Sequence, residues 1–270
     1  MIVFPPCKIN LGLHIVNRRD DGYHNVETIF YPVPFHDILE AVPAGNDRFT
    51  FTTSGISVPG TSDENLCVRA WKLLHEERGA RPVWMHLHKV IPMGSGLGGG
   101  SSDAAHVLLL LNNLLDLNIG IMELEYYASR LGSDCPFFIR SIPALATGRG
   151  EKLHPVEVSL KGYRLVLVIP PVHVSTAKAY LRVNPQIPSW SLEDLPRTPV
   201  EQWYKFVVNG FEESVFSEYP LIGDVCREMY LSGAVYAAMS GSGSAVYGIF
   251  RSTGQLPLSV AGYPALRFDL

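Results

Sequence analysis

The chain has 270 residues, of which 47% are hydrophobic and 18% are charged, as is ordinary for a globular protein of one or two domains. Its formal net charge of -4 indicates no basic face for nucleic acid. The longest apolar run, VLLLL at 107–111, is too short to span a bilayer, and the N-terminal MIVFPPCKIN lacks the features of a signal peptide.

The beginning of the chain predicts strands. Residues 7–16, CKINLGLHIV, alternate between apolar and polar side chains, which is typical of a strand with one buried face. Lys8, Asn10 and His14 fall on the opposite, polar face. The Asp21-Gly22 pair predicts a turn after this strand. Further strands are expected over 26–33, 37–42 and 49–53.

Helices and strands alternate over the remainder of the chain. Asp63 is expected to cap a helix over 64–78 that ends at Gly79. The other expected helices are 101–115, 122–131 (ending at Gly132), a short one capped by Ser175, 200–208, 211–217 and 221–231. The other expected strands are 83–90, 163–171 and a pair around the Gly-Ser turn of AVYAAMSGSGSAVYGIF.

This order of elements predicts an α+β fold in two parts. Strand-rich and helical segments follow one another twice, which differs from a regular βαβ series. The polar, turn-rich stretch ATGRGEKLHPVE near 145–160 suggests a boundary, giving domains over 1–150 and 151–270.

The four cysteines bear on the compartment. Cys7, Cys67, Cys135 and Cys226 lie far apart and form no Cys-x-x-Cys pair. Neither a disulfide framework nor a zinc site is therefore expected, and a cytoplasmic location is favoured. His86 and His88 alternate on one expected strand without an evident third ligand, so we interpret them as ordinary strand residues and predict no metal site.

The stretch IPMGSGLGGGSSDAA at 91–105 places five glycines directly before an expected helix. Successive backbone N–H groups at a helix N-terminus bind anions, and glycine lets a phosphate approach the backbone closely. The stretch therefore suits a nucleotide triphosphate. The residues expected to bind ATP here are Pro92, Met93, Gly94, Ser95, Gly96, Leu97, Gly98, Gly99, Gly100, Ser101 and Ser102.

Other interpretations of these glycines fit less well. A Walker loop requires a lysine after its glycines, and a protein-kinase glycine loop joins two strands rather than opening a helix. Gly94, Gly96 and Gly99 match the dinucleotide pattern, but five glycines satisfy many patterns. A flexible loop without a ligand remains an alternative.

Pro92, Gly96-Leu97, Gly99-Gly100-Ser101-Ser102 and Ala104-Ala105 resemble the phosphate loop of the GHMP kinases, which include galactokinase, homoserine kinase and mevalonate kinase. PPCKINLGLHI at 5–15, DDGYH at 20–24, LGSDCPFF at 131–138 and SGSGSAVYG at 240–248 extend the resemblance over essentially the whole chain. It implies an N-terminal ribosomal-protein-like α+β domain and a C-terminal ferredoxin-like α/β sandwich. The departures from the family pattern are Ser95, Ser133, Cys135, Tyr180 and Ser242.

The resemblance also implies a reaction. It points to members of the family that transfer the γ-phosphoryl group of ATP, with Mg²⁺, to the C2 hydroxyl of CDP-methylerythritol on the non-mevalonate route to isoprenoid precursors. ATP and this small molecule are the expected partners, with no nucleic acid and no membrane, and the chain is expected to be a monomer or weak homodimer. A GHMP kinase for another small alcohol and a non-catalytic nucleotide-binding protein are the alternatives.

Site residues follow from the same resemblance. It assigns Lys8 and Asp134 to catalysis, with Asp134 as the general base. From the chain alone, Lys8 could equally be a surface lysine and Asp134 a turn or capping aspartate. The resemblance further assigns Asn10, Tyr23, His24, Thr176 and Tyr180 to substrate binding, with the aromatic rings around cytosine, and Asn65 and Lys89 to the adenine side of ATP.

Overall fold

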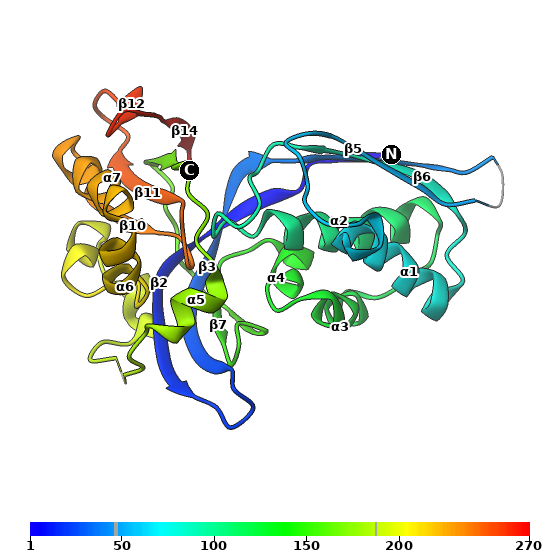
Figure 1. Ribbon diagram of the computed structural model, residues 1–270, viewed down its shortest axis with the longest axis horizontal. Coiled ribbons are helices and arrows are strands. Elements are labelled where there is room, and N and C mark those ends of the chain that lie inside the picture. The colour runs from blue at the N-terminus through cyan, green and yellow to red at the C-terminus, as the bar shows by residue number, and fades with distance from the viewer. Residues whose placement is uncertain (46–47, 187) are drawn as a thin grey trace. The chain divides into compact units, whose positions relative to one another are not determined.

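In the computed structural model, which describes residues 1–45, 48–186 and 188–270, the alternating segment near the start forms the long strand β2 (Pro6–Arg18; Figure 1). The predicted Asp21-Gly22 turn follows it, with Gly22 N donating to Arg19 O, and leads into β3 (His24–His36). One prediction about β2 is wrong: its polar face is buried as well, and Lys8 is only 3% exposed. Periodicity alone could not show this, because the contacts on that face come from separate parts of the chain, among them Thr28, Gly96 and Ser240.

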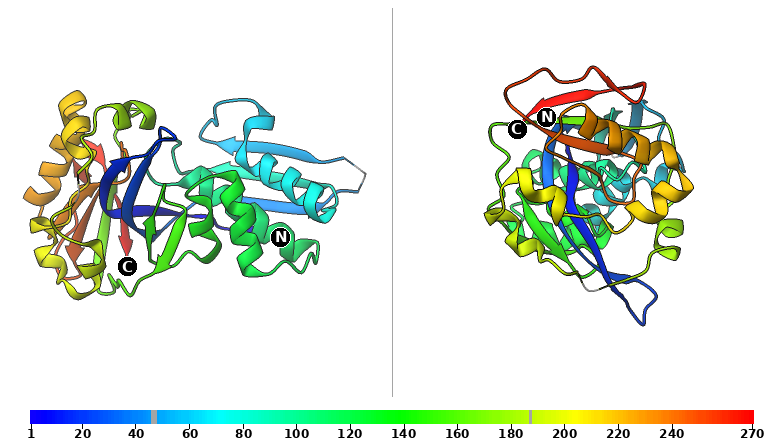
Figure 2. Two further views of the ribbon diagram at one scale, coloured as in Figure 1. Left: turned by 90° about the horizontal axis from the view of Figure 1, so that it is seen from below. Right: turned by 90° about the vertical axis from the view of Figure 1, so that its left-hand side faces the viewer.

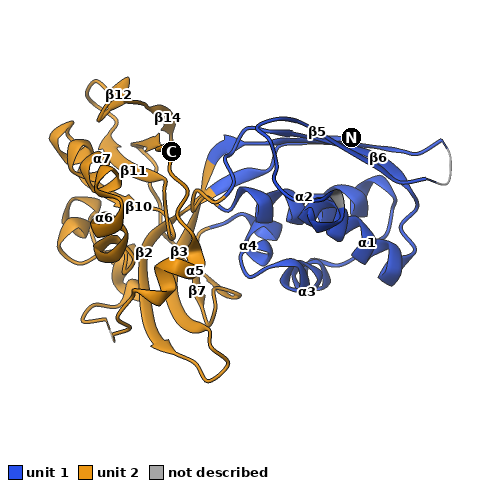
Figure 3. Cartoon of the chain, in the orientation of Figure 1, with its two compact units in different colours: residues 1–7, 34–93, 98–142 blue, residues 8–33, 94–97, 143–270 orange. Residues whose placement is uncertain are grey.

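The backbone divides into two compact units, shown in Figure 3. Unit 1 comprises residues 1–7, 34–93 and 98–142, and unit 2 comprises residues 8–33, 94–97 and 143–270. These units are not two consecutive halves of the sequence. The stretch near 145–160 is not a linker, because it contains β7 (Ala144–Thr147) and β8 (Lys152–Pro155), which join β3 in one sheet.

Unit 1 is a four-stranded sheet with helices on one face (Figure 1). The strands lie in the order β1-β4-β6-β5, and only β5 and β6 are parallel. Their bounds are β1 (Ile2–Val3), β4 (Ile38–Pro43), β5 (Thr50–Gly55) and β6 (Val83–Lys89). The helices are η1 (Ser62–Glu64), α1 (Leu66–Arg78), α2 (Gly99–Leu114), α3 (Ile121–Leu131) and α4 (Cys135–Arg140). Helix α2 contacts β4, and its buried side chains include Leu108, Leu110 and Leu111.

Unit 2 contains two four-stranded sheets, ordered β2-β3-β7-β8 and β10-β11-β9-β14, and a small ribbon of β12 and β13. The remaining strands are β9 (Tyr163–Val168), β10 (Tyr236–Met239), β11 (Val246–Arg251), β12 (Ser259–Val260), β13 (Tyr263–Pro264) and β14 (Leu266–Asp269). The helices are α5 (Thr176–Leu181), η2 (Leu192–Arg197), η3 (Val200–Lys205), α6 (Glu212–Glu218) and α7 (Pro220–Leu231). In Figure 2, α7 covers β10 and β11, burying Ile222 and Met229 over Val246.

Two helix predictions need correction. The cap of α1 is Asn65 rather than Asp63: the Asn65 side chain accepts from Cys67 N at 2.8 Å, while Asp63 forms an ion pair with Lys72 at 3.0 Å. The expected helix over 200–208 is the shorter 3₁₀ helix η3. The stop at Gly79 is confirmed, since this residue has a left-handed backbone with φ of 63°. Among the described residues, none of the helices has the length and hydropathy needed to cross a membrane.

Candidate active site

The glycine stretch leaves β6 and enters α2 through a backbone that only glycine accommodates. Gly96 has φ of +80°, and a Cβ built there would lie 1.9 Å from Ser240 O. Gly98, at φ +70°, is the N-cap of α2 and gives that helix no side-chain cap. The segment is therefore a shaped turn packed on the strand-end loop at 240–244, and not a flexible linker.

The first turn of α2 supplies the anion-binding groups. The helix has 16 residues, and its first bond in this turn runs from Ser102 N to Gly98 O at 2.9 Å. The N–H groups of Gly99, Gly100 and Ser101 come before that bond, where a helix has no internal acceptors for them. The turn contains no acidic residue, so the positive end of the helix dipole is not neutralised locally. This end of α2 can accept a phosphate.

Beneath the loop lies a buried ion cluster. Lys89 Nζ, whose side chain is 0% exposed, donates to Asp37 Oδ2 and, at 2.7 Å, to Asp103 Oδ2. Asp37 Oδ1 also accepts from the N–H groups of Val90 and Ile91. Burial disfavours a charged lysine, but the two carboxylates outweigh it and raise the pKa of Lys89. Burial raises the pKa of Asp103 to about 7, because one lysine cannot balance two buried carboxylates.

This cluster changes the interpretation of Lys89. A Cβ at Gly99 would lie 3.0 Å from Lys89 Nζ, so the lysine supports the base of the loop from inside unit 1. Because the side chain of Lys89 has no exposed surface, the structure gives no support to the predicted contact between Lys89 and ATP. The same holds for Ser102, which is fully buried with its hydroxyl 3.5 Å from His106 Nδ1.

Asn65 and Ser101 already have protein partners. Asn65 Oδ1 is used in capping α1, so only its amide nitrogen is open to the predicted role at adenine. The Ser101 hydroxyl interacts with the thiol of Cys135, whose pKa burial raises to about 12. Ser101 can still offer its N–H to a phosphate.

Asp134 lies at the N-cap position of α4, after the turn that Gly132 begins. It is half-buried, and its carboxylate accepts no capping bond from the N–H groups of α4. The interpretation of Asp134 as a capping residue is therefore not supported.

Lys8 is the centre of a buried network in unit 2. Its Nζ donates to Asn10 Oδ1 at 2.6 Å and to Gly96 O at 3.1 Å, and it lies 4.9 Å from the centre of the Phe30 ring. Asn10 Nδ2 in turn donates to Thr28 Oγ1 at 2.9 Å. The side chain of Asn10 therefore orients the ammonium of Lys8, whereas direct substrate contact by Asn10 stays a prediction.

The three residues with rings that were predicted to bind the substrate, Tyr23, His24 and Tyr180, all lie in unit 2. The His24 ring stacks on Tyr180 with centroids 4.8 Å apart and an interplanar angle of 16°, and Tyr180 meets the edge of Phe211. Tyr23 is 57% exposed, with the Arg149 guanidinium 5.1 Å from its ring centre. Burial and the nearby Arg18 lower the pKa of His24, which favours the neutral imidazole, a form that can both donate and accept a hydrogen bond.

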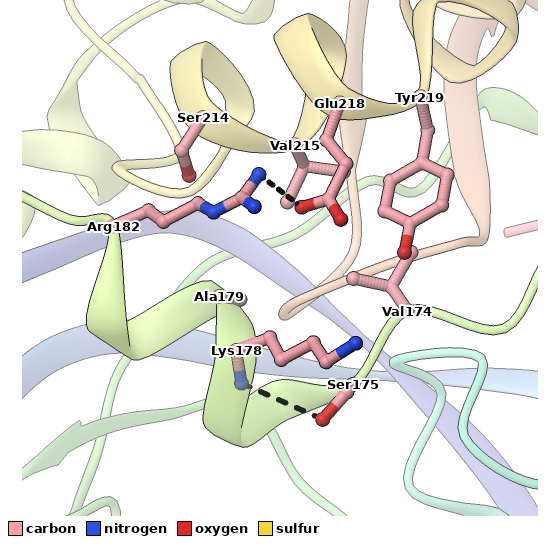
Figure 4. Close-up of a pocket in the computed structure, with 9 residues that line it drawn as sticks. All are labelled: Val174, Ser175, Lys178, Ala179, Arg182, Ser214, Val215, Glu218 and Tyr219. Atoms are coloured by element: carbon pink, nitrogen blue, oxygen red, sulfur yellow. Dashed lines mark hydrogen bonds and ion pairs between the residues drawn. The ribbon is translucent and has the colours of Figure 1, made fainter.

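Thr176 opens α5 and exchanges a hydrogen bond with Ser242 Oγ at 2.8 Å. The predicted cap of this helix is confirmed, since Ser175 Oγ accepts from Lys178 N. Figure 4 shows the residues that line a hollow beside α5, among them the ion pair of Arg182 and Glu218. The volume of this hollow is about 10 Å³. It has room for about one water, so it is not a substrate site.

Sequence reasoning did not assign Ser240, Tyr247 or Arg149. Ser240 Oγ donates to Gly96 O at 2.9 Å, and Tyr247 Oη donates to Asn10 O at 2.7 Å. Both residues lie in the glycine motif at 240–248, which was the available signal. For Arg149 the sequence offered no signal, because its place over Tyr23 depends on how the β7–β8 turn folds. Among the described residues, no three His, Cys, Asp or Glu side chains are arranged to hold a metal.

Comparison with known proteins supplies the context. The model of the GHMP kinases N terminal domain matches residues 65–141, and that of the GHMP kinases C terminal domain matches residues 192–257. The 4-diphosphocytidyl-2-C-methyl-D-erythritol kinase of Bacteroides thetaiotaomicron is 48% identical over 95% of this chain and 94% of its own. The protein of that name from Parabacteroides distasonis is 51% identical over 93% of this chain and 92% of its own.

Solved structures agree with these matches. The crystal structure of a 4-(cytidine 5'-diphospho)-2C-methyl-D-erythritol kinase superposes with a TM-score of 0.76 at 36% identity, covering 92% of this chain and 90% of its own. Homoserine kinase from Cytophaga hutchinsonii superposes with a TM-score of 0.70 at 17% identity, covering 92% of this chain and 86% of its own. At that identity the second match bears on the fold alone.

Proposed function

The chain belongs to the GHMP kinases, and from this premise we propose that it phosphorylates the C2 hydroxyl of 4-diphosphocytidyl-2-C-methyl-D-erythritol with ATP. The relatives named for this activity share about half of their residues with it over nearly its whole length. The same proposal includes the expected family domains over 1–150 and 151–270. It also includes a cytoplasmic location, since all four cysteines are buried thiols.

The observation that carries the choice of substrate is the stack of His24 on Tyr180, together with the exposed ring of Tyr23, which directly precedes His24 in the sequence. A base gains about 1–3 kcal/mol by stacking on an aromatic ring, and a neutral histidine can hydrogen-bond to the edge of cytosine. A small alcohol such as mevalonate or homoserine has no ring for which these side chains are suited. Asn10 and Thr176 complete the proposed substrate contacts.

Phosphoryl transfer needs positioning and charge stabilisation more than covalent participation by the protein. In the proposed reaction, Asp134 accepts the proton of the C2 hydroxyl as its oxygen bonds to the γ-phosphorus, and the bond to the β–γ bridging oxygen breaks to release ADP. Lys8, held by Asn10 and Gly96, stabilises negative charge that develops in the transition state. The first turn of α2 binds the phosphates.

Mg²⁺ belongs to this proposal as part of the ATP complex. When bound, it neutralises charge on the phosphate oxygens. Asn65, Lys89, Ser102 and the other residues of 92–101 remain proposed ATP neighbours. Of these, Lys89 and Ser102 act from buried positions.

The decisive experiment measures ADP release with four alcohols: 4-diphosphocytidyl-2-C-methyl-D-erythritol, mevalonate, homoserine and galactose. We expect turnover with the first to exceed turnover with the others by orders of magnitude. A preference for any other alcohol would assign the chain to a different branch of the family. ATP binding without turnover of any of the four would favour a non-catalytic nucleotide-binding protein.

A further inference from the structure

Asn209 lies in a short connection between η3 and α6 that runs beside β2. Leu13 N donates to Val208 O at 2.9 Å, and Gly210 N donates to Leu13 O at 2.7 Å, which makes Leu13 and Asn209 bridge partners. Asn209 is 4% exposed. The connection is therefore fixed to the strand that carries Lys8, and the Asn209 side chain starts from a defined position.

The amide of Asn209 uses both kinds of hydrogen-bonding atom. Its Nδ2 donates to Met239 O and to Gly241 O, each at 2.8 Å, and its Oδ1 accepts from Phe211 N at 3.0 Å. Two carbonyl acceptors require an NH₂ group, and a backbone N–H requires an oxygen, so the orientation of the amide is determined by its partners. The two carbonyls belong to the residues on either side of Ser240.

Glu212, in the first turn of α6, holds the same loop at a third point. Its carboxylate oxygen accepts from Met239 N at 2.8 Å. Met239 is thus held at its N–H by Glu212 and at its carbonyl by Asn209. Because both backbone polar groups of Met239 are hydrogen-bonded, the backbone of the next residue, Ser240, is also held in position.

Ser240 shares its acceptors with Lys8. Ser240 Oγ lies 2.9 Å from Gly96 O and 3.4 Å from Asn10 Oδ1. Lys8 Nζ donates to these same two oxygens, at 3.1 and 2.6 Å respectively. A shift of Ser240 would therefore change the two oxygens that set the direction of the ammonium.

We propose that Asn209, with Glu212, is a positioning residue for Lys8, acting through the backbone on either side of Ser240 and through the oxygens that Ser240 and Lys8 share. The inference rests on the proposed role of Lys8 in phosphoryl transfer. It assigns a function in the reaction to a buried residue whose side chain bonds to the protein backbone. Aspartate cannot replace Asn209, because it would place a carboxylate oxygen against two carbonyls.

The first test is Asn209→Asp, which keeps the acceptor for Phe211 N and removes both donors. Misplacement of a catalytic group by about 1 Å costs on the order of 100-fold in rate. We expect kcat to fall by about 10- to 100-fold. The dissociation constants of ATP and of the alcohol, measured by calorimetry, should change less than about threefold. In a Lys8→Met background, Asn209→Asp should cost little more, because residues that act as a unit are not additive.

Asn112→Asp is the matched control. Asn112 closes the connection after α2 in the same manner, donating to Ile119 O at 3.1 Å and accepting from Ile119 N at 2.9 Å. Asn112→Asp also keeps the acceptor and removes the amide donor, with the loss of one donated bond where Asn209→Asp loses two, and we expect its kcat to stay near that of the unchanged protein. Equal kcat losses in the two variants, or an undiminished loss in the Lys8→Met background, would overturn the positioning role.

Glu212 provides a second pair of variants in case Asn209→Asp does not fold. Glu212→Gln keeps an oxygen for Met239 N and should retain kcat, whereas Glu212→Leu removes that acceptor and should lower kcat. Hydrogen exchange of the peptide over 239–245 gives a readout independent of turnover, and exchange should accelerate in Asn209→Asp and Glu212→Leu. Unchanged exchange would refute the proposal, while accelerated exchange in a chain that phosphorylates none of the four alcohols would refute only the proposed function.

Discussion

The residues assigned to proton transfer can be tested separately from those assigned to binding. Asp134→Asn preserves size and removes a proton acceptor whose carboxylate α4 does not use for capping. General-base catalysis contributes about 10²–10⁴ in rate, so we expect kcat to fall by at least about 100-fold. ATP and alcohol affinities should be retained.

Lys8→Met should also lower kcat, because it removes a buried charge held by Asn10 and Gly96. If both groups act on one step, the double variant should be little worse than the poorer single one. Near-normal turnover by Asp134→Asn with intact binding would remove this residue from the mechanism. Single-turnover measurements with saturating ATP would show which case holds.

A second prediction at this scale concerns base recognition. Tyr23→Ala should weaken binding of the alcohol by roughly 10- to 100-fold, the equivalent of about 1–3 kcal/mol of stacking. ATP affinity should hardly change. Tyr204→Ala is the matched control, since Tyr204 is 58% exposed and has the ammonium of Lys205 5.6 Å from its ring centre. Equal weakening of ATP and alcohol by Tyr23→Ala would instead indicate a structural role.

At the scale of elements, the glycine loop shows which substitution is a clean probe of phosphate binding. Gly99→Val is not one, because a Cβ there would lie 2.8 Å from the Ile91 side chain and 3.0 Å from Lys89 Nζ. Loss of ATP binding in that variant could therefore arise from damage to the packing of unit 1. Gly100 is more suitable, since its Cβ would meet only the flexible end of Met93 at 3.3 Å.

We expect Gly100→Ala to weaken ATP binding at least about tenfold, because a methyl group obstructs the approach of phosphate to the backbone. Its thermal midpoint should be equal or higher, because alanine is favoured over glycine within a helix by about 1 kcal/mol. Gly120→Ala, at the N-cap of α3 with nothing within 4 Å of its Cβ, is the control. Unchanged ATP affinity in a folded Gly100→Ala variant would argue against the first turn of α2 as the phosphate site.

Local patterns predicted most elements, and where they were wrong the cause lay elsewhere in the chain. Alternation revealed β2 but not the burial of its polar face, which depends on Ser240 and Tyr247. Asp63 was expected to cap α1, but the cap is Asn65, two positions later, because the backbone at Asn65 places its side chain within reach of Cys67 N. The turn-rich stretch near 150 concealed a hairpin because β7 and β8 are only four residues long.

The residues of the candidate site that belong to short sequence motifs could be predicted, and those outside such motifs could not. Lys8, Asp134 and the glycines could be named from such stretches, whereas the buried ion cluster around Lys89 could not. Asp37, Lys89 and Asp103 lie in three separate segments with no shared pattern. These three side chains come into contact only when unit 1 is folded.

For the molecule as a whole, a buried carboxylate predicts how stability depends on pH. Burial raises the pKa of Glu212 to about 7, from 4.5 for an ordinary glutamate, although its bond from Met239 N acts in the opposite direction. Between these values the folded chain holds a proton that the unfolded chain has released. Stability should therefore fall as the pH rises from about 4.5 to about 7, by roughly 3 kcal/mol for this group.

Glu212→Gln removes the part of the fall in stability with rising pH that comes from the Glu212 carboxyl group. Relative to the unchanged protein, the variant should gain stability progressively across that pH window, with the full difference reached above about pH 7. Asp103, whose pKa is also about 7, leaves a remaining decline in both proteins. Urea midpoints measured from pH 4.5 to 8 provide the comparison. Curves that stay parallel over the whole range would show that Glu212 does not titrate in this way.

The interleaving of the two units also bears on the chain while it is being made. Lys8 and Asn10 emerge early, but Ser240 is synthesised 230 residues after Asn10, a delay of about 10–50 s at typical elongation rates. Throughout that interval, β2 lacks the serine and the tyrosine that cover its polar face. Later in that interval the chain already contains Lys8, Asn10 and Gly96 but not Ser240, whose hydroxyl shares the two oxygens to which Lys8 donates. The hydrogen bonds of Ser240 to Asn10 and Gly96 can therefore form only after translation has passed residue 240.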